Sequence, residues 1–139
     1  MTATAARPVR IGIAVVRHGR KYLVGERSND QPLEGRAEFP GGKCLAGEDS
    51  RACAERECLE ESGLAVTARE QIIRTEFDYP HGMLDLTFWL CEVALEDDVR
   101  QSHLGFAWVD EADLAKLHFP SANQPVIRLL TGQGGFGFT

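Results

Sequence analysis

Three glutamates lie close together near the end of a polar segment, at Glu57, Glu60 and Glu61. If this segment is a helix, Glu57 and Glu61 lie one turn apart and Glu60 lies beside them. Each like-charged pair at these spacings costs a helix about 0.2–0.5 kcal/mol, and the negative end of the helix dipole also disfavours carboxylates. Local rules that are broken several times within one turn are typical of a functional site.

The chemistry that suits such a cluster is the binding of a hard divalent cation. Mg²⁺ prefers oxygen ligands and retains several waters, so two or three carboxylates plus a nearby carbonyl make a suitable site. The glycines of the preceding "PGG" let the backbone approach closely and can expose that carbonyl. Arg56 neighbours Glu60 on the helix and can hold its carboxylate in a fixed position. The alternative is a solvated helix face preceded by an ordinary glycine turn.

A helix from Asp49 to Ser62 must position these residues. Nothing in this range breaks a helix, Asp49 or Ser50 can cap its start, and Gly63 can end it. Runs of aliphatic, β-branched and aromatic residues predict strands at 9–18, 21–27, 64–79, 83–95 and 105–109. A loop is predicted at 28–38, a break at 39–42, and short helices at 110–117 and 122–132. Strands around one central helix predict an α/β sandwich.

The composition of the 139-residue chain is that of one globular domain, with 43% hydrophobic and 26% charged residues. No apolar run approaches the ~20 residues of a membrane span, and the start has no apolar segment typical of a secretory signal. We therefore expect a cytoplasmic protein without a membrane partner. A net charge of −6 argues against a nucleic-acid polymer as partner, because binding to phosphate backbones is driven by basic residues.

Four cysteines occur, at Cys44, Cys53, Cys58 and Cys91, and none forms a C-x-x-C pair. They are too few and too scattered for a disulfide scaffold. The sequence favours reduced thiols packed in the core, with zinc binding as the weaker alternative.

The glutamates belong to a longer pattern that starts at Gly42, passes through Glu48 and Arg56–Glu57, and ends at Leu64. This pattern resembles the Nudix box, G-x5-E-x7-R-E-U-x-E-E-x-G-U, where U is apolar; every fixed position is filled, with Cys58 in place of the usual aliphatic residue. The resemblance implies a Nudix α/β/α sandwich with a mixed β-sheet, as a single domain over 1–139 with its core at about 7–132. It also implies hydrolysis of a nucleoside diphosphate derivative with Mg²⁺ as cofactor, or alternatively Mn²⁺.

The roles implied by the resemblance are assigned position by position. Glu57, Glu60 and Glu61 are the implied metal ligands, and Glu57 is also a candidate base. Gly41 is the implied carbonyl donor. Glu48 and Arg56 are the implied supporting residues of the catalytic site.

Three further stretches, "EFPGGK", "TFWLCEV" and "FPSANQPVI", are similar to the MutT branch of this family. That branch converts nucleoside triphosphates, notably 8-oxo-dGTP, to the monophosphate and pyrophosphate. The similarity implies that Asn123 recognises a purine and that Phe39, Tyr79 and Arg27 contact the base. The alternatives are a helix N-cap for Asn123, core packing for the two aromatic residues, and a solvated strand end for Arg27.

The sequence departs from the branch at two places. Ser102 stands where a glutamate is usual, although Glu96, Asp97 or Asp98 is close enough to replace it. His81 and Gly82 stand in place of a charged pair, so His81 either contacts the base or is a solvated loop residue. The expected function is therefore an 8-oxo-dGTP or related oxidised purine pyrophosphohydrolase. The alternatives are a CTP or other pyrimidine nucleotide pyrophosphohydrolase and a nucleotide-sensing module without activity.

Overall fold

The computed structural model describes residues 8–26, 36–80, 82–100 and 103–132, with Tyr79 described by its backbone alone. Seven strands of these residues form one sheet with the order β3-β2-β1-β6-β5, while β4 pairs with β1 and β7 with β2. The strands are β1 (Val9–His18), β2 (Lys21–Glu26), β3 (Ala37–Glu38), β4 (Gly41–Lys43), β5 (Val66–Tyr79), β6 (Gly82–Val93) and β7 (Phe106–Asp110). The sheet is mixed, because β1 runs parallel to β6 and antiparallel to β2 and β4.

Strand β1 lies at the centre of the fold and is covered on both faces. Side chains of a strand alternate between the two faces of a sheet. Ala14 and Val16 therefore pack in one apolar core with Ala54 of α1 (Ser50–Ser62), while Val15 packs in the other core. A strand buried on both faces reads as a continuous hydrophobic run, which is why β1 was predictable from the sequence with both of its ends.

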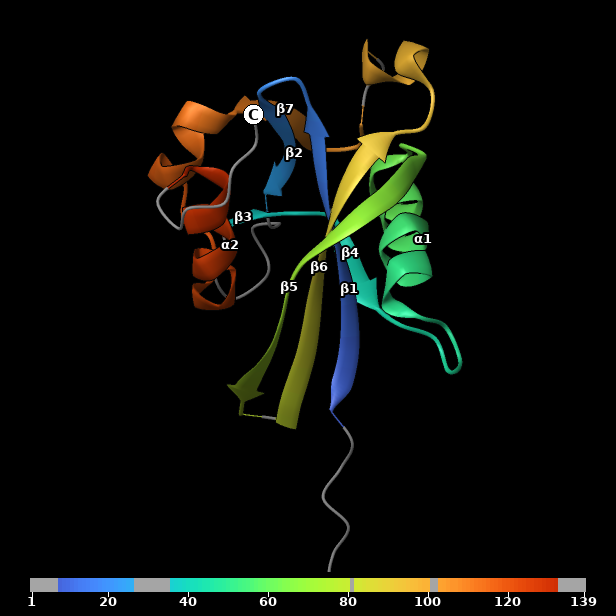
Figure 1. Cartoon of the computed structure of the whole chain (residues 1–139), viewed down its shortest axis with the longest axis vertical. Helices are drawn as coiled ribbons and strands as arrows, with labels where there is room; N and C mark the ends of the chain where they lie inside the picture. The colour runs from blue at the N-terminus through green and yellow to red at the C-terminus, as the bar shows by residue number, and fades with distance from the viewer. Residues whose placement is uncertain (1–7, 27–35, 81, 101–102, 133–139) are drawn as a thin grey trace, which may run out of the picture.

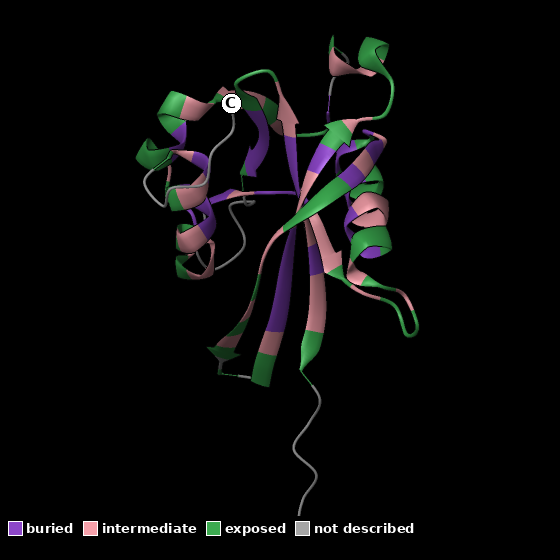
Figure 2. Cartoon of the chain, in the orientation of Figure 1, coloured by how far each residue is buried: buried purple, intermediate pink, exposed green. Residues whose placement is uncertain are grey.

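Helices cover the two faces of the sheet separately (Figure 1). Helix α1 packs on one face, and the opposite face is covered by η2 (Glu111–Lys116) and α2 (Gln124–Leu130), whose buried side chains join the second core. Figure 2 shows the buried residues along the middle of the sheet and on the inner sides of these helices. This arrangement is the α/β/α sandwich with a mixed sheet that the sequence predicts. None of the described helices is long and apolar enough to cross a membrane.

Helix α1 begins and ends where its caps predict. The side chain of Asp49 accepts a hydrogen bond from the backbone of Ala52 at 2.8 Å. Gly63 ends the helix with a φ of 77°, and its backbone N–H donates to Leu59 O at 2.9 Å. A Cβ at Gly12 would lie 2.7 Å from Ser50 O, so this glycine lets β1 approach the helix backbone closely.

The structure adds elements that the sequence does not predict. Strand β3 lies at the end of the predicted loop at 28–38, and β4 takes up the second half of the predicted break at 39–42. Strand β4 is extended because Gly41 and Gly42 pair with Ile13 and Gly12 of β1. Such pairing depends on distant residues and leaves no local signal in a glycine-rich stretch. Two 3-10 turns, η1 (Glu96–Arg100) and η3 (Ser121–Asn123), are also added, and the predicted helix at 110–117 is the 3-10 helix η2.

Candidate metal and nucleotide site

Arg56 is the centre of the carboxylate cluster on α1. Its Nε and Nη2 atoms contact the two oxygens of Glu48 at 2.8 and 3.0 Å, which is a bidentate pair. Nη1 reaches Glu60 Oε2 at 2.7 Å and Glu57 Oε2 at 3.2 Å. Nη2 also donates to the carbonyl of Lys43 at 3.0 Å. One guanidinium thus orients three carboxylates and ties the helix to the loop after β4.

Glu48 is the best-fixed of these carboxylates. Its Oε1 also accepts a hydrogen bond from Leu45 N at 2.9 Å, which closes the loop before the helix. The hydrogen bonds from Arg56 and then from the Leu45 backbone lower the pKa of Glu48 to about 2. The same pairing with Glu48 raises the pKa of Arg56. Glu48 is therefore ionised at neutral pH and holds Arg56 in place.

Gly41 and Gly42 at the start of β4, which we call the glycine turn, fit against the carboxylates of the helix. A Cβ at Gly42 would collide with the carboxyl group of Glu57, so glycine here lets this side chain lie against β4 in its observed position. The backbone N–H of Gly41 donates to Glu61 Oε1 at 2.8 Å. Strand β4 therefore places a backbone N–H directly beside the glutamates, while the role expected of the Gly41 carbonyl stays a prediction.

Glu61 lies in a setting that disfavours its ionised form. The pKa of Glu61 is raised to about 6, chiefly by partial burial and also by the negative charges of Glu38, Glu57 and Glu60, against the opposing effect of the Gly41 hydrogen bond. A carboxylate that resists ionisation beside other carboxylates marks a place where a cation would relieve repulsion.

The donor set matches the requirements of a hard cation. Glu57, Glu60 and Glu61 supply carboxylate oxygens, and Glu60 remains 54% exposed at its side chain while Glu57 is only 18% exposed. Carboxylate oxygens at a partly open surface suit an ion that keeps several waters. The arrangement can hold a divalent cation against the phosphates of a nucleotide.

Two residues, Gly42 and Glu38, have roles in the structure that the sequence alone does not predict. Gly42 is the glycine that admits the Glu57 side chain, and its fixed place at the start of the box is the signal that points to it. Glu38 adds to the field at Glu61, although it lies outside the box. No local pattern reveals that contribution, because β3 is brought to the helix by the sheet.

The residues predicted to contact the base are only partly assembled. Phe39 is 6% exposed and stacks on Phe119 with ring centroids 4.8 Å apart, which is the core-packing alternative. Asn123 is half-buried and stands before α2, but its side chain makes no capping hydrogen bond there. The N-cap alternative for Asn123 is therefore wrong, and its amide is not engaged in holding the helix. The Phe39–Phe119 stack connects the glycine turn to the segment that carries Asn123.

Several predicted residues lie outside the described part of the chain. These are Arg27, His81, Ser102 and the side chain of Tyr79, whose backbone ends β5. Their roles stay predictions.

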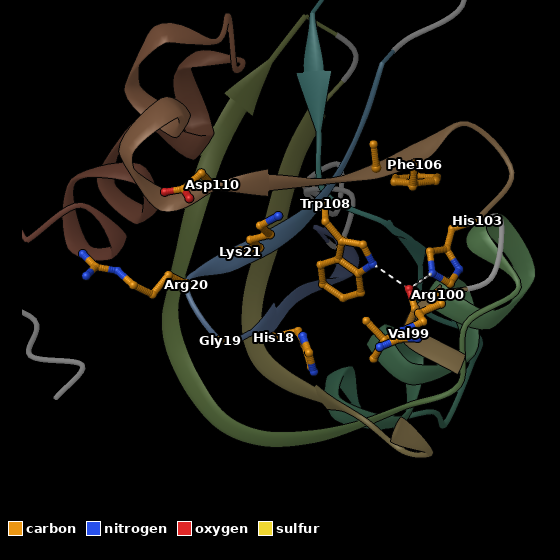
Figure 3. A pocket seen from close by; sticks show the side chains of 11 residues that line it. His18, Gly19, Arg20, Lys21, Val99, Arg100, His103, Phe106, Trp108 and Asp110 are labelled. Atoms are coloured by element: carbon orange, nitrogen blue, oxygen red, sulfur yellow. Dashed lines mark hydrogen bonds between the residues drawn. The ribbon is translucent and has the colours of Figure 1, made fainter. Parts of the chain in front are cut away.

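The acidic residues proposed as replacements for Ser102 belong to η1. Glu96 contacts His18 Nε2 at 2.9 Å, so one of the three is already paired with the end of β1. Turn η1 borders a cavity of about 740 Å³, and among the described residues none that line this cavity belongs to the box. In Figure 3 Trp108 and His103 converge on the carbonyl of Val99, which fixes η1 over β7.

Comparison with known proteins places the whole box inside a recognised domain. A family model described as the NUDIX domain matches residues 12–129. The 8-oxo-dGTP diphosphatase of Haemophilus influenzae is 30% identical over 128 residues, covering 90% of this chain and 93% of that protein. The 8-oxo-dGTP diphosphatase of Escherichia coli is 27% identical over 125 residues, covering 89% of this chain and 97% of that protein.

A solved structure agrees with these sequence matches. The solution structure of MutT from methicillin-resistant Staphylococcus aureus superposes with a TM-score of 0.72 at 26% identity, over 92% of this chain and 98% of that one. The matching domain, the complete box and the shared fold together show that this chain is a member of the Nudix hydrolase family.

Proposed function

We propose that this Nudix hydrolase is a nucleoside triphosphate pyrophosphohydrolase of MutT type that favours 8-oxo-dGTP or a related oxidised purine nucleotide. Its products would be the nucleoside monophosphate and pyrophosphate. The observation that carries the proposal is the carboxylate cluster of α1, fixed by Arg56 and seated on the glycine turn. The similarity to diphosphatases named for 8-oxo-dGTP supports the choice of substrate.

Nudix hydrolases generally need divalent metal ions. In this chain Glu57, Glu60 and Glu61, with the carbonyl of Gly41, would hold Mg²⁺, because they offer the oxygen donors that this ion prefers. When bound, such an ion supplies charge neutralisation at the phosphates and lowers the pKa of a bound water.

The side chains around these ligands have distinct tasks. Arg56 orients Glu57 and Glu60 and is itself anchored by the ionised Glu48. Glu57 is the candidate base because its carboxylate is held between Arg56 and the face of Gly42, and a fixed carboxylate can accept a proton from the attacking water. Accurate placement of such groups contributes a large part of the rate.

Selection of the base would fall to Asn123. A carboxamide donates and accepts hydrogen bonds together, so it can read both kinds of group on a purine edge. Because the Asn123 side chain does not cap α2, its amide is available to bind a base. A site built to form such hydrogen bonds discriminates strongly against a base that leaves them unmade.

A nucleotide panel tests this function. Release of pyrophosphate and monophosphate would be measured with Mg²⁺ for the common ribo- and deoxyribonucleoside triphosphates and for 8-oxo-dGTP. We expect the highest kcat/KM for 8-oxo-dGTP. The highest value for CTP or dCTP would overturn the purine assignment, and binding of nucleotides without turnover of any would show a sensing module instead of an enzyme.

A further inference from the structure

We propose that Cys44, Cys53 and Glu48 form a second metal site, selective for a thiophilic divalent ion such as Zn²⁺ or Cd²⁺. This site uses none of the proposed magnesium ligands, although it shares Glu48 with the carboxylate cluster of α1. It lies at the junction of the loop after β4 with the first half of α1, where the loop supplies Cys44 and Glu48 and the helix supplies Cys53.

The donor atoms are already close together. One sulfur from each cysteine and one carboxylate oxygen of Glu48 lie within 4.8 Å of one another. A tetrahedral ion with metal–sulfur bonds of about 2.3 Å needs its two sulfurs about 3.8 Å apart. Side-chain movements of about 1 Å would therefore bring the three donor atoms onto one metal ion. The fourth position would be taken by water.

Access and charge also fit a metal site. Cys44 is half-buried and Cys53 is fully buried, so the pair is reached from the Cys44 side. Glu48 is ionised, and although it binds Arg56 and Leu45 N, a carboxylate has further lone pairs for a metal. The other two cysteines, Cys58 and Cys91, are buried in the core around α1, away from this loop.

The chemistry selects the kind of ion. Binding converts two thiols and one M²⁺ into a dithiolate complex and releases two protons to solvent. The thiol of Cys53 is buried and donates to the carbonyl of Gly42 at 3.3 Å. Only an ion with strong affinity for thiolate displaces that proton, so Mg²⁺ stays on the glutamates while Zn²⁺ or Cd²⁺ takes the sulfurs. Because Glu48 also anchors Arg56, the two sites share one residue.

Cd²⁺ titration of the whole chain tests this site. The protein is reduced with a phosphine, which leaves thiols free, and kept in excess Mg²⁺ to fill the carboxylate site. The readouts are the ultraviolet thiolate-to-Cd²⁺ charge-transfer absorption and proton release measured with an indicator. We expect saturation at one Cd²⁺ per chain with about two protons released.

Variants identify the donors. Cys44→Ala, at the half-buried position, should abolish the absorption while the melting curve stays cooperative. Cys91→Ala is the matched control and should keep it. Glu48→Gln should weaken Cd²⁺ affinity by about tenfold or more. No saturable band in the wild-type chain, a band that survives Cys44→Ala, or an affinity unchanged in Glu48→Gln would overturn the site.

Discussion

The box segment and the residues proposed to contact the base are built in opposite ways. From Gly41 to Glu61 the described contacts run continuously, because Arg56 joins Glu48, Glu57 and Glu60, and Gly41 joins Glu61. The residues proposed to contact the base come instead from separate elements, and the stack of Phe39 on Phe119 joins the stretch before the box to the stretch that leads to Asn123. The proposed hydrolytic residues are thus local in the sequence, whereas the residues proposed for base selection are brought together only by the packing of distant segments.

This contrast has a functional consequence. A local, self-supporting site transfers between relatives with its motif, while a dispersed pocket changes whenever one loop changes. Variants in the box should therefore reduce turnover of every nucleotide. Variants in the base-facing region should change the ratios between nucleotides.

The largest effect is expected from removing charge in the box. Glu57→Gln and Glu61→Gln should each lower kcat by about 10²–10⁴-fold for all substrates, because a ligand or base is lost with little change of volume. Steady-state kinetics with Mg²⁺ measures this. Glu70→Gln, on an exposed position of β5, is the matched control and should keep wild-type turnover. Near-normal kcat in both box variants would show that the cluster is only a solvated helix face.

The next effect tests the fit of the glycine turn. Gly42→Ala places a methyl group against the Glu57 carboxylate, a side-chain end that can move, so kcat should fall by about 10²-fold with little loss of stability. Gly12→Ala is the contrasting control, because its methyl group meets the backbone of α1 and should lower stability by about 1–3 kcal/mol. Kinetics paired with thermal melting separates the two. Equal losses of stability in both variants would contradict the proposed role of Gly42.

In the base-facing region the effect should be selective. Asn123→Ala should cost about 1–3 kcal/mol in kcat/KM for the preferred purine nucleotide and spare poor substrates. The melting temperature should not change, because the Asn123 side chain makes no capping bond. Ser121→Ala, on the exposed neighbour in η3, is the control. Unaltered ratios among 8-oxo-dGTP, dGTP and dCTP would remove Asn123 from base recognition.

The smallest effect is a pH dependence of stability in the metal-free chain. The pKa of Glu61 is raised from about 4.5 to about 6, so the folded state binds more protons than the unfolded state between these values. Stability from this residue is present below pH 4.5 and is lost as the pH rises through 6. Glu61→Gln should therefore raise the melting temperature in EDTA at pH 7 and not at pH 4.5. A gain of equal size at both pH values would contradict the raised pKa.

Features formed by neighbouring residues could be predicted from the sequence, whereas features formed by distant segments could not. The range and caps of α1 and both ends of β1 were predictable, because capping residues and hydrophobic runs are local signals. Strand β4 was not, because its pairing with β1 is formed by distant residues. The contact of Gly42 with Glu57 was also hidden, since it needs the turn and the helix to be docked.

Asn123 shows how a local rule can fail. An N-cap residue normally has extended backbone angles, which let its side chain reach the first free N–H groups of the helix. Asn123 instead has φ −89° and ψ −13°, because the 3-10 turn η3 continues directly into α2. With this backbone the amide is not used as a cap, although its position in the sequence indicates one.

We propose that the glutamates of α1 act with a divalent cation to split a nucleoside triphosphate between its α- and β-phosphates. The most direct measurement is product analysis with 8-oxo-dGTP in thoroughly chelated buffer before and after addition of Mg²⁺. We predict no turnover in EDTA, and with Mg²⁺ the formation of 8-oxo-dGMP and pyrophosphate in equal amounts. Full turnover without a divalent ion, or release of orthophosphate in place of pyrophosphate, would contradict the account.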